Sequence, residues 1–173
     1  RSHFIGESTG GTVGLWMAAQ QKEALASLTM VSAAHRGGSL GRVLALKDDI
    51  ARLGMERWSA DLMAQRFHDG ALSRDQWDWF HAVQRAADPK ACVDLLDMLV
   101  AVDLTAALPT IETPTLIIAP DGSPFVSLES QVERLRAMPN SRLQVIAHSK
   151  HGVAFSHGEE CARVFDCARE SRV

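Results

Sequence analysis

The chain contains 173 residues, which allows one compact domain and leaves little room for a second. Its hydrophobic fraction of 46% and charged fraction of 23% are typical of globular proteins and exclude a largely disordered chain. The formal net charge of -3, with acidic and basic residues interspersed, argues against nucleic acid as a partner. The longest apolar stretch, residues 13–19, is far shorter than the roughly 20 residues of a bilayer span, so we expect no membrane span.

The cysteines and the N-terminus bear on the cellular compartment. The chain has an odd number of cysteines, namely Cys92, Cys161 and Cys167, and none of them has CxxC spacing. This pattern predicts neither a disulfide framework nor a zinc site. We expect buried or partly buried free thiols. The chain begins with Arg1 rather than Met, so we expect the true N-terminus to be missing and localisation cannot be read from it. A cytoplasmic location is the default expectation.

The first 32 residues have the pattern of a β-α-β unit. Residues 3–6 resemble the end of a short strand, and residues 12–23 carry apolar side chains at helical density. A second apolar run follows at residues 26–32. A strand, a helix and a strand in close succession predict a right-handed crossover and therefore a parallel sheet.

Between residues 40 and 108 the pattern changes to consecutive helices. Ser73 and Gln76 have the spacing of a capping box, and Asp88 followed by Pro89 is a typical helix start. No convincing strand interrupts this block. We therefore predict an all-helical insertion over residues 39–108.

The α/β alternation resumes after this insertion. Residues 115–119 have the apolar composition of a buried strand, and residues 142–147 are predicted to form another strand. Residues 128–138 and 159–169 are expected to be helical. Together with residues 1–38, the segment 109–173 is predicted to form one α/β core with a parallel sheet.

The sequence Gly6-Glu7-Ser8-Thr9-Gly10 fits the motif G-x-S-x-G between a predicted strand and a predicted helix. In that setting the glycines would flank a sharp elbow, where side chains would collide with the neighbouring elements, and Ser8 would be exposed as a nucleophile. The alternative is a glycine-rich loop in which Ser8 only caps the following helix. The backbone N–H of Thr9 would donate to an oxyanion in the first case.

A serine hydroxyl needs a base, and His151 is the strongest candidate among seven histidines. It lies just beyond the strand at 142–147, where sites of open α/β sheets form. His148 and His157 are more plausibly structural. A metal cluster of these three histidines carries little weight, because no carboxylate or thiol stands nearby with a familiar ligand spacing.

The third member of a serine-histidine-acid triad is expected in the loop after residues 115–119. Asp121 is the only carboxylate there. Its alternative role is to shape the turn Pro120-Asp121-Gly122.

With these motifs the sequence resembles the C-terminal part of an α/β-hydrolase of the esterase and lactonase type. The stretch Gly54-Met55-Glu56-Arg57-Trp58 in the helical block resembles the 3-oxoadipate enol-lactonase branch more than any other. The matching stretches cover nearly all of the chain outside the helical block: residues 3–11, 113–119, 139–143, 149–152 and 157–160. The resemblance implies a parallel sheet with an inserted helical cap, no cofactor, and a triad of Ser8, His151 and Asp121.

Two features depart from the family pattern. The triad acid commonly stands immediately before the proline, a position that is Ser123 here, and the segment Ser32-Ala33-Ala34-His35 after the second strand holds no carboxylate either. Family members also place about four strands before the elbow, together with the loop that supplies the second oxyanion donor. We therefore expect a partial fold, and a chain that is weakly active or poorly soluble in isolation.

The sequence thus predicts a serine hydrolase that acts on a small-molecule carboxylic ester or lactone. We expect the cap to close over a mostly apolar pocket, to which the aromatic side chains Trp58, Trp77, Trp79 and Phe80 could contribute. At least half of these four are expected to pack in the core instead. A second hypothesis is a hydrolase-like binding protein that has lost turnover. A third keeps the fold and changes the reaction to carbon–carbon cleavage or cofactor-free haloperoxidation. The oligomeric state does not follow from the sequence.

Overall fold

The computed structural model describes residues 1–170, so the end of the predicted core segment, residues 171–173, lies outside the described residues. In chain order the strands and helices are β1 (Ser2–Glu7), α1 (Thr9–Gln20), β2 (Leu25–Val31), α2 (Val43–Arg66), α3 (Arg74–Arg85), α4 (Pro89–Ala101), β3 (Thr115–Pro120), α5 (Leu128–Ala137), β4 (Ser141–Ile146), α6 (Val153–Ser156) and α7 (Gly158–Glu170). Short 3₁₀ turns lie at Gly37–Ser39 and Thr105–Thr110.

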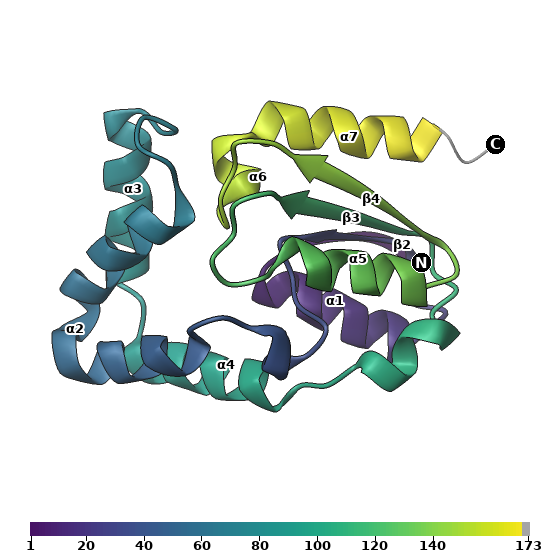
Figure 1. Ribbon diagram of the computed structural model, residues 1–173, viewed down its shortest axis with the longest axis horizontal. Helices are drawn as coiled ribbons and strands as arrows, with labels where there is room; N and C mark the ends of the chain where they lie inside the picture. Colours follow the sequence, from purple (N-terminus) through teal and green to yellow (C-terminus); the bar gives the residue numbers. More distant parts are fainter. Residues whose placement is uncertain (171–173) are drawn as a thin grey trace.

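The strands form one parallel sheet, as the sequence predicted, and their order in it is β1-β2-β3-β4. The central strands β2 and β3 are buried almost throughout because helices cover both of their faces. This explains why their sequences are continuous apolar runs rather than alternating ones. All four strands point the same way, so the loops that follow them gather at one edge of the sheet (Figure 1).

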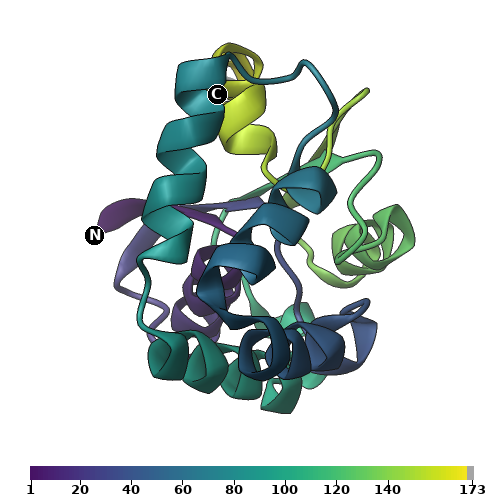
Figure 2. The same cartoon turned by 90° about the vertical axis from the view of Figure 1, so that its left-hand side faces the viewer.

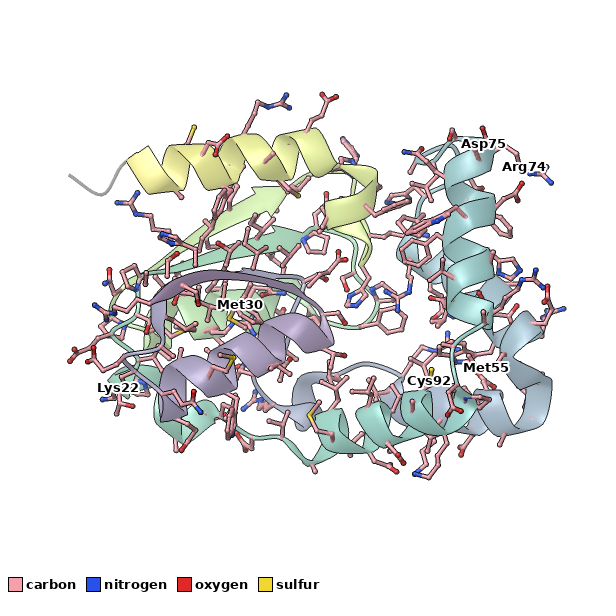
Figure 3. All side chains as sticks on the ribbon, turned by 180° about the vertical axis from the view of Figure 1, so that it is seen from behind. Lys22, Met30, Met55, Arg74, Asp75 and Cys92 are labelled. Carbon is pink, nitrogen blue, oxygen red and sulfur yellow. The ribbon has the colours of Figure 1, made fainter. Side chains whose placement is uncertain are left out.

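Helices lie on both faces of the sheet. Helices α1 and α5 cover one face and α7 covers the other (Figure 1). Met30 of β2 is fully buried in the cluster between the sheet and α1 (Figure 3), whereas Val31 faces the cluster under α7. Successive residues of one strand thus supply two separate cores.

Strand β1 is an edge strand within the described residues, since it pairs only with β2. Its side chain Ile5 is 57% exposed, and Trp16 on the neighbouring α1 is 46% exposed. An apolar side chain on an open strand edge is a site for association with further chain segments.

Helices α2, α3 and α4 stand together beside the sheet (Figure 2). Gly54 has a φ of 72° and divides α2 into two helical stretches that run in different directions (Figure 1). The two predicted helix starts are confirmed. Ser73 and Gln76 form a reciprocal capping box, and the Asp88 side chain accepts a hydrogen bond from Ala91 N–H at 2.8 Å.

Aromatic packing attaches the helical segment to the core. Phe80 of α3 lies edge-on to Phe67 at 5.1 Å and to Phe155 of α6 at 5.2 Å between ring centroids, and Trp79 stacks on Phe155. Such pairs contribute about 0.5–1.5 kcal/mol each beyond their buried area. Arg74 and Asp75 lie at the outer end of α3, away from the sheet (Figure 3).

No disulfide joins the three cysteines of the described chain. Cys92 is half-buried and Cys161 is buried, but Cys167 is exposed, contrary to our expectation, because it lies on the outer side of α7. Within residues 1–170 no helix is both long and apolar enough to cross a bilayer.

Candidate active site

Four loops at one edge of the sheet bring four side chains together. Ser8 follows β1, Ser32 follows β2, Ser123 lies in the loop after β3, and His151 lies in the loop after β4. Since the carboxyl ends of parallel strands meet at the same edge, residues separated by up to 143 positions become neighbours.

The backbone at Ser8 forms the predicted sharp elbow, with φ 52° and ψ -120°. A Cβ atom on Gly6 would lie 2.4 Å from the backbone of Gly10, so this position accepts only glycine without rearrangement. Our reason for the second glycine was wrong, because a Cβ on Gly10 would meet nothing within 4 Å. The tight contact is made instead by Gly11, whose Cβ would lie 2.5 Å from that of Ala33.

The Ser8 hydroxyl lies 2.8 Å from Nε2 of His151. It makes no capping bond to α1, so the alternative role of Ser8 as a helix cap is not the one this structure displays. The positive φ of Ser8 directs its side chain to a histidine instead of to its own helix. An activated nucleophile requires this geometry.

His151 is buried, with 3% of its surface exposed, and Phe125 packs edge-on against its ring at 4.8 Å. Burial first, and the nearby Arg66 guanidinium second, lower its pKa to about 3. The imidazole is therefore neutral at neutral pH and can accept a proton at one nitrogen.

The other ring nitrogen of His151 faces hydroxyl groups. Nδ1 lies 2.9 Å from Ser32 Oγ and 3.2 Å from Ser123 Oγ. A hydroxyl can accept a proton from Nδ1–H or donate one to Nδ1, whereas a carboxylate only accepts. The two serines therefore hold the ring in place without fixing its tautomer. Neither Ser32 nor Ser123 was predicted from the sequence to belong to the site, because each stands where a carboxylate was sought.

Asp121 lies in the loop after β3, as Ser123 does, but its carboxylate does not face His151. It accepts hydrogen bonds from the backbone N–H of His148 at 2.9 Å and of Ser149 at 3.0 Å. Although partial burial acts in the opposite direction, these backbone donors lower the pKa of Asp121. No contact between Asp121 and His151 is recorded, so the structure shows Asp121 bracing the histidine loop rather than touching the imidazole.

The histidine loop is also fixed to the end of α2. Gly152 N–H donates to the Arg66 carbonyl at 3.1 Å, and Lys150 Nζ donates to the Ala64 carbonyl at 2.8 Å. These bonds satisfy terminal helix carbonyls that otherwise lack partners. His148 is exposed, and His157 contacts Ser156. No group of three His, Cys, Asp or Glu side chains suited to a metal is found in residues 1–170.

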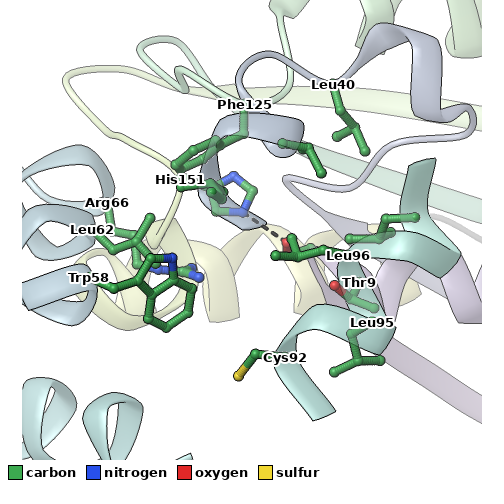
Figure 4. Close-up of a pocket in the computed structure, with 14 residues that line it drawn as sticks. Thr9, Leu40, Trp58, Leu62, Arg66, Cys92, Leu95, Leu96, Phe125 and His151 are labelled. Carbon is green, nitrogen blue, oxygen red and sulfur yellow. Dashed lines mark hydrogen bonds between the residues drawn. The ribbon is translucent and has the colours of Figure 1, made fainter. Parts of the chain in front are cut away.

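A pocket of about 170 Å³ opens beside the Ser8–His151 pair (Figure 4). Helices α2 and α4 supply most of its wall, which is largely apolar, as predicted. Its lining residues are Ser8, Thr9, Leu40, Val43, Leu46, Trp58, Leu62, Arg66, Cys92, Leu95, Leu96, Leu99, Phe125 and His151. A cavity of this size accommodates a group about as large as benzene.

Of the four aromatic residues expected near the pocket, only Trp58 lines it. Phe80 and Trp79 belong to the aromatic packing around Phe155, and Trp77 lies 5.0 Å from the ring of His81. Only Trp58 is buried, whereas Phe80 is half-buried and Trp77 and Trp79 are exposed, so our expectation that at least half of the four pack in the core was wrong.

Two half-buried charged groups beside the site were not predicted from the sequence. Glu7 accepts a hydrogen bond from Ala154 N–H at 3.2 Å, and burial raises its pKa. Arg66 lines the pocket and lies near Glu7 and His151. Glu7 sits inside the motif, but a lone arginine at the end of a helix gives no sequence signal of its own.

A parallel sheet with helices on both faces and a serine on a strand–helix elbow defines the α/β-hydrolase fold. The chain belongs to the alpha/beta hydrolase family, whose family model matches residues 1–164.

Three similar proteins illustrate this membership. A protein of Stutzerimonas stutzeri named "Putative carbamate hydrolase RutD" is 29% identical over 170 residues, which cover 92% of this chain and 62% of that protein. The enol-lactonase of Burkholderia xenovorans LB400 superposes with a TM-score of 0.89 at 17% identity, covering 99% of this chain and 66% of its own. A bromoperoxidase of Bacillus anthracis gives 0.86 at 18% identity, with coverages of 98% and 67%. This chain thus spans about six tenths of the curated relative's length.

Proposed function

We propose that this protein is a serine hydrolase that cleaves a small carboxylic ester or lactone. The observation that carries the proposal is the 2.8 Å contact between Ser8 Oγ and His151 Nε2 at the mouth of an apolar pocket. Family membership and the hydrolase relatives support the reaction class. The mechanism requires no cofactor.

The proposed reaction proceeds in two steps. His151 Nε2 takes the proton of Ser8 as Oγ attacks the acyl carbon, and the same proton then passes to the leaving alkoxide as the C–O bond breaks. Water attacks the resulting acyl-serine, His151 accepts a proton from that water, and the acid is released as the proton returns to Ser8.

The backbone N–H of Thr9 is the proposed oxyanion donor. Thr9 is the first residue of α1, where an N–H group has no partner within the helix, and it lines the pocket beside Ser8. Loss of one such donor costs about 10²–10³ in rate, so a second donor would matter greatly for activity.

The role assigned to Asp121 in the sequence analysis is revised in this proposal. Ser123 Oγ already accepts from Phe125 N–H and Val126 N–H, which leaves its proton to point toward Nδ1. Ser32 Oγ has His151 as its only recorded partner, so it is the better acceptor for Nδ1–H. We assign Ser32 as the residue that supports the productive tautomer, and Asp121 as the residue that positions the loop.

We further propose that α2, α3 and α4 act as a cap, in keeping with the predicted insertion at residues 39–108. Helices α2 and α4 furnish the apolar wall opposite Ser8, and aromatic contacts fix α3 to α6. A cap that supplies the substrate wall sets specificity separately from the chemistry on the sheet.

A second candidate function is binding without turnover. It is favoured by one observation, namely that hydroxyls rather than a carboxylate face Nδ1. Without a negative charge at that nitrogen, the imidazolium formed in the transition state is stabilised poorly, and loss of the acid costs about 10⁴ in kcat in serine proteases. Carbon–carbon cleavage and haloperoxidation remain alternatives that a substrate panel would separate.

The test of the proposed function uses a fluorophosphonate probe and an activated ester. We expect the probe to label wild-type protein at Ser8, and S8A to abolish both labelling and ester hydrolysis. The variant H151Q should slow labelling strongly, while H148Q, which changes an exposed histidine of the same loop, serves as the matched control. Hydrolysis that persists in S8A would refute the proposal, and labelling without turnover would favour the binding protein.

A further inference from the structure

Helix α5 buries a polar face against the sheet (Figure 1). The buried residues of this helix are Ser130, Gln131 and Arg134, and their spacing places all three on one side of it. A helix that covers a sheet normally buries apolar side chains there. The polar side chains under α5 therefore need hydrogen-bond partners inside the protein.

Arg134 is the most unusual of these residues, because 0% of its surface is exposed. It donates from Nη2 to Gln131 Oε1, but within the described chain its Nε and Nη1 have no hydrogen-bond partner. It takes part in no ion pair within 4.0 Å in residues 1–170, and its neighbour Glu133 pairs with Arg36 at 3.0 Å instead. Burial lowers the pKa of Arg134 to about 10, so the guanidinium stays charged at neutral pH. A buried cation without a paired anion is strongly unfavourable.

Three further buried side chains have polar atoms that lack partners in the part of the chain that the structure describes. These atoms are Gln131 Nε2, Ser130 Oγ and both ring nitrogens of His35, and each of the three side chains is at most 5% exposed. His35 follows β2 and lies near α5, since its Nε2 is 4.0 Å from Glu133 Oε1. Burial and then Arg134 lower the pKa of His35 most, so these two side chains lie in the same region.

The chemistry of these groups indicates an anion rather than a neutral ligand. All of the unpartnered atoms are donors or can act as donors, and Arg134 adds one positive charge. The other charges nearby do not balance it, since Glu133 is paired with Arg36, and Asp103 is exposed and accepts from Thr105 N–H. A single monovalent anion would balance the site. Chloride suits an enclosed position better than phosphate or sulfate, whose higher charge costs more to desolvate.

We propose that one chloride ion binds between α5 and the segment after β2, where Arg134 and Gln131 donate to it and His35 and Ser130 complete its surroundings. Among the described residues that line the pocket beside Ser8, none belongs to this group of four. The site is therefore separate from the proposed active site, and the inference goes beyond the proposed function. The ion would join two segments of the folded chain, so chloride should stabilise the folded protein.

The test compares thermal unfolding in sodium chloride with that in sodium gluconate, whose anion is too large for the site, at equal ionic strength. At about 0.2 M salt the melting temperature of the wild-type protein should be higher in chloride by about 2–4 °C, and the difference should saturate with chloride concentration. The variant R134M removes the buried cation and should abolish the difference. The matched control R136M removes an exposed arginine of the same helix and should retain it.

A second variant keeps the test decisive if R134M does not fold. The variant Q131E places a carboxylate beside Arg134, so it should remove the chloride dependence without loss of stability. Line broadening in chloride NMR reports bound chloride directly, and we expect it in wild type and R136M but not in Q131E. Equal melting temperatures of the wild-type protein in the two salts, or equal chloride effects in wild type and Q131E, would overturn the inference. Neither result bears on ester hydrolysis by Ser8.

Discussion

Ser123 stands at the position where the family pattern places an acid, and its hydroxyl lies 3.2 Å from Nδ1 of His151. The same oxygen accepts backbone N–H groups of Phe125 and Val126, a role that a carboxylate can also fill. The local backbone therefore suits an aspartate at this position. Burial and then Arg66 lower the pKa of His151 to about 3, and the hydroxyls at Nδ1 bring no negative charge to oppose them, so the imidazole is a weak base.

We predict that S123D raises kcat for an activated ester at pH 7 by about tenfold or more. The new carboxylate raises the pKa of His151, so the acid limb of the pH–rate profile should move to higher pH than in the wild-type protein. The control is S123N, which is similar in shape but uncharged. Equal rates for S123D and S123N would show that charge at Nδ1 does not limit the reaction.

At the scale of secondary-structure elements, the junction of β1 and α1 places the nucleophile. Helix α1 approaches the sheet closely here, because Gly6 faces the backbone of Gly10 and Gly11 faces Ala33, just after β2. The left-handed conformation of Ser8 is held by these contacts on both sides. The small residues at this junction thus allow α1 to pack closely against the sheet.

We predict that G6A destabilises the protein by about 1–3 kcal/mol and reduces activity, since its methyl group would overlap the helix backbone. The matched control is G10A, which adds the same methyl group where no atom lies within 4 Å and should be neutral or stabilising by about 0.5 kcal/mol. Urea unfolding measures both changes. Equal destabilisation by the two variants would contradict the steric account.

At the scale of the whole molecule, two buried histidines couple stability to pH. His151 lies in the site, and His35 is fully buried with neither ring nitrogen hydrogen-bonded. Burial first and then Arg134 lower the pKa of His35 to about 4, with Glu133 and Asp103 acting in the opposite direction and Arg36 reinforcing the shift. Both rings are neutral in the folded protein near pH 7.

We predict that the protein loses stability as the pH falls from about 6.5 to 4. As the pH falls, the unfolded chain binds protons on these histidines near pH 6.5, whereas the folded protein binds them only at lower pH. The stability that the neutral histidines contribute is therefore fully present above pH 6.5 and is lost as the pH falls below it. Each histidine contributes a slope of about 1.4 kcal/mol per pH unit. Urea unfolding of H35Q should show a shallower dependence on pH, whereas H68Q, which changes an exposed histidine, should keep the wild-type slope.

The sequence by itself determined the parallel sheet, the helix starts at Ser73 and Asp88, and the elbow at Ser8, because periodicity, capping and glycine placement are local properties of the chain. It also singled out His151, since a histidine in the loop after a parallel strand lies at the carboxyl edge of the sheet. The tertiary structure alone decided that Ser32 and Ser123 meet Nδ1, that Asp121 turns to the backbone of His148 and Ser149, and that Arg66 lines the pocket. These contacts join residues from different loops, and their geometry depends on loop conformations and burial that no local pattern encodes.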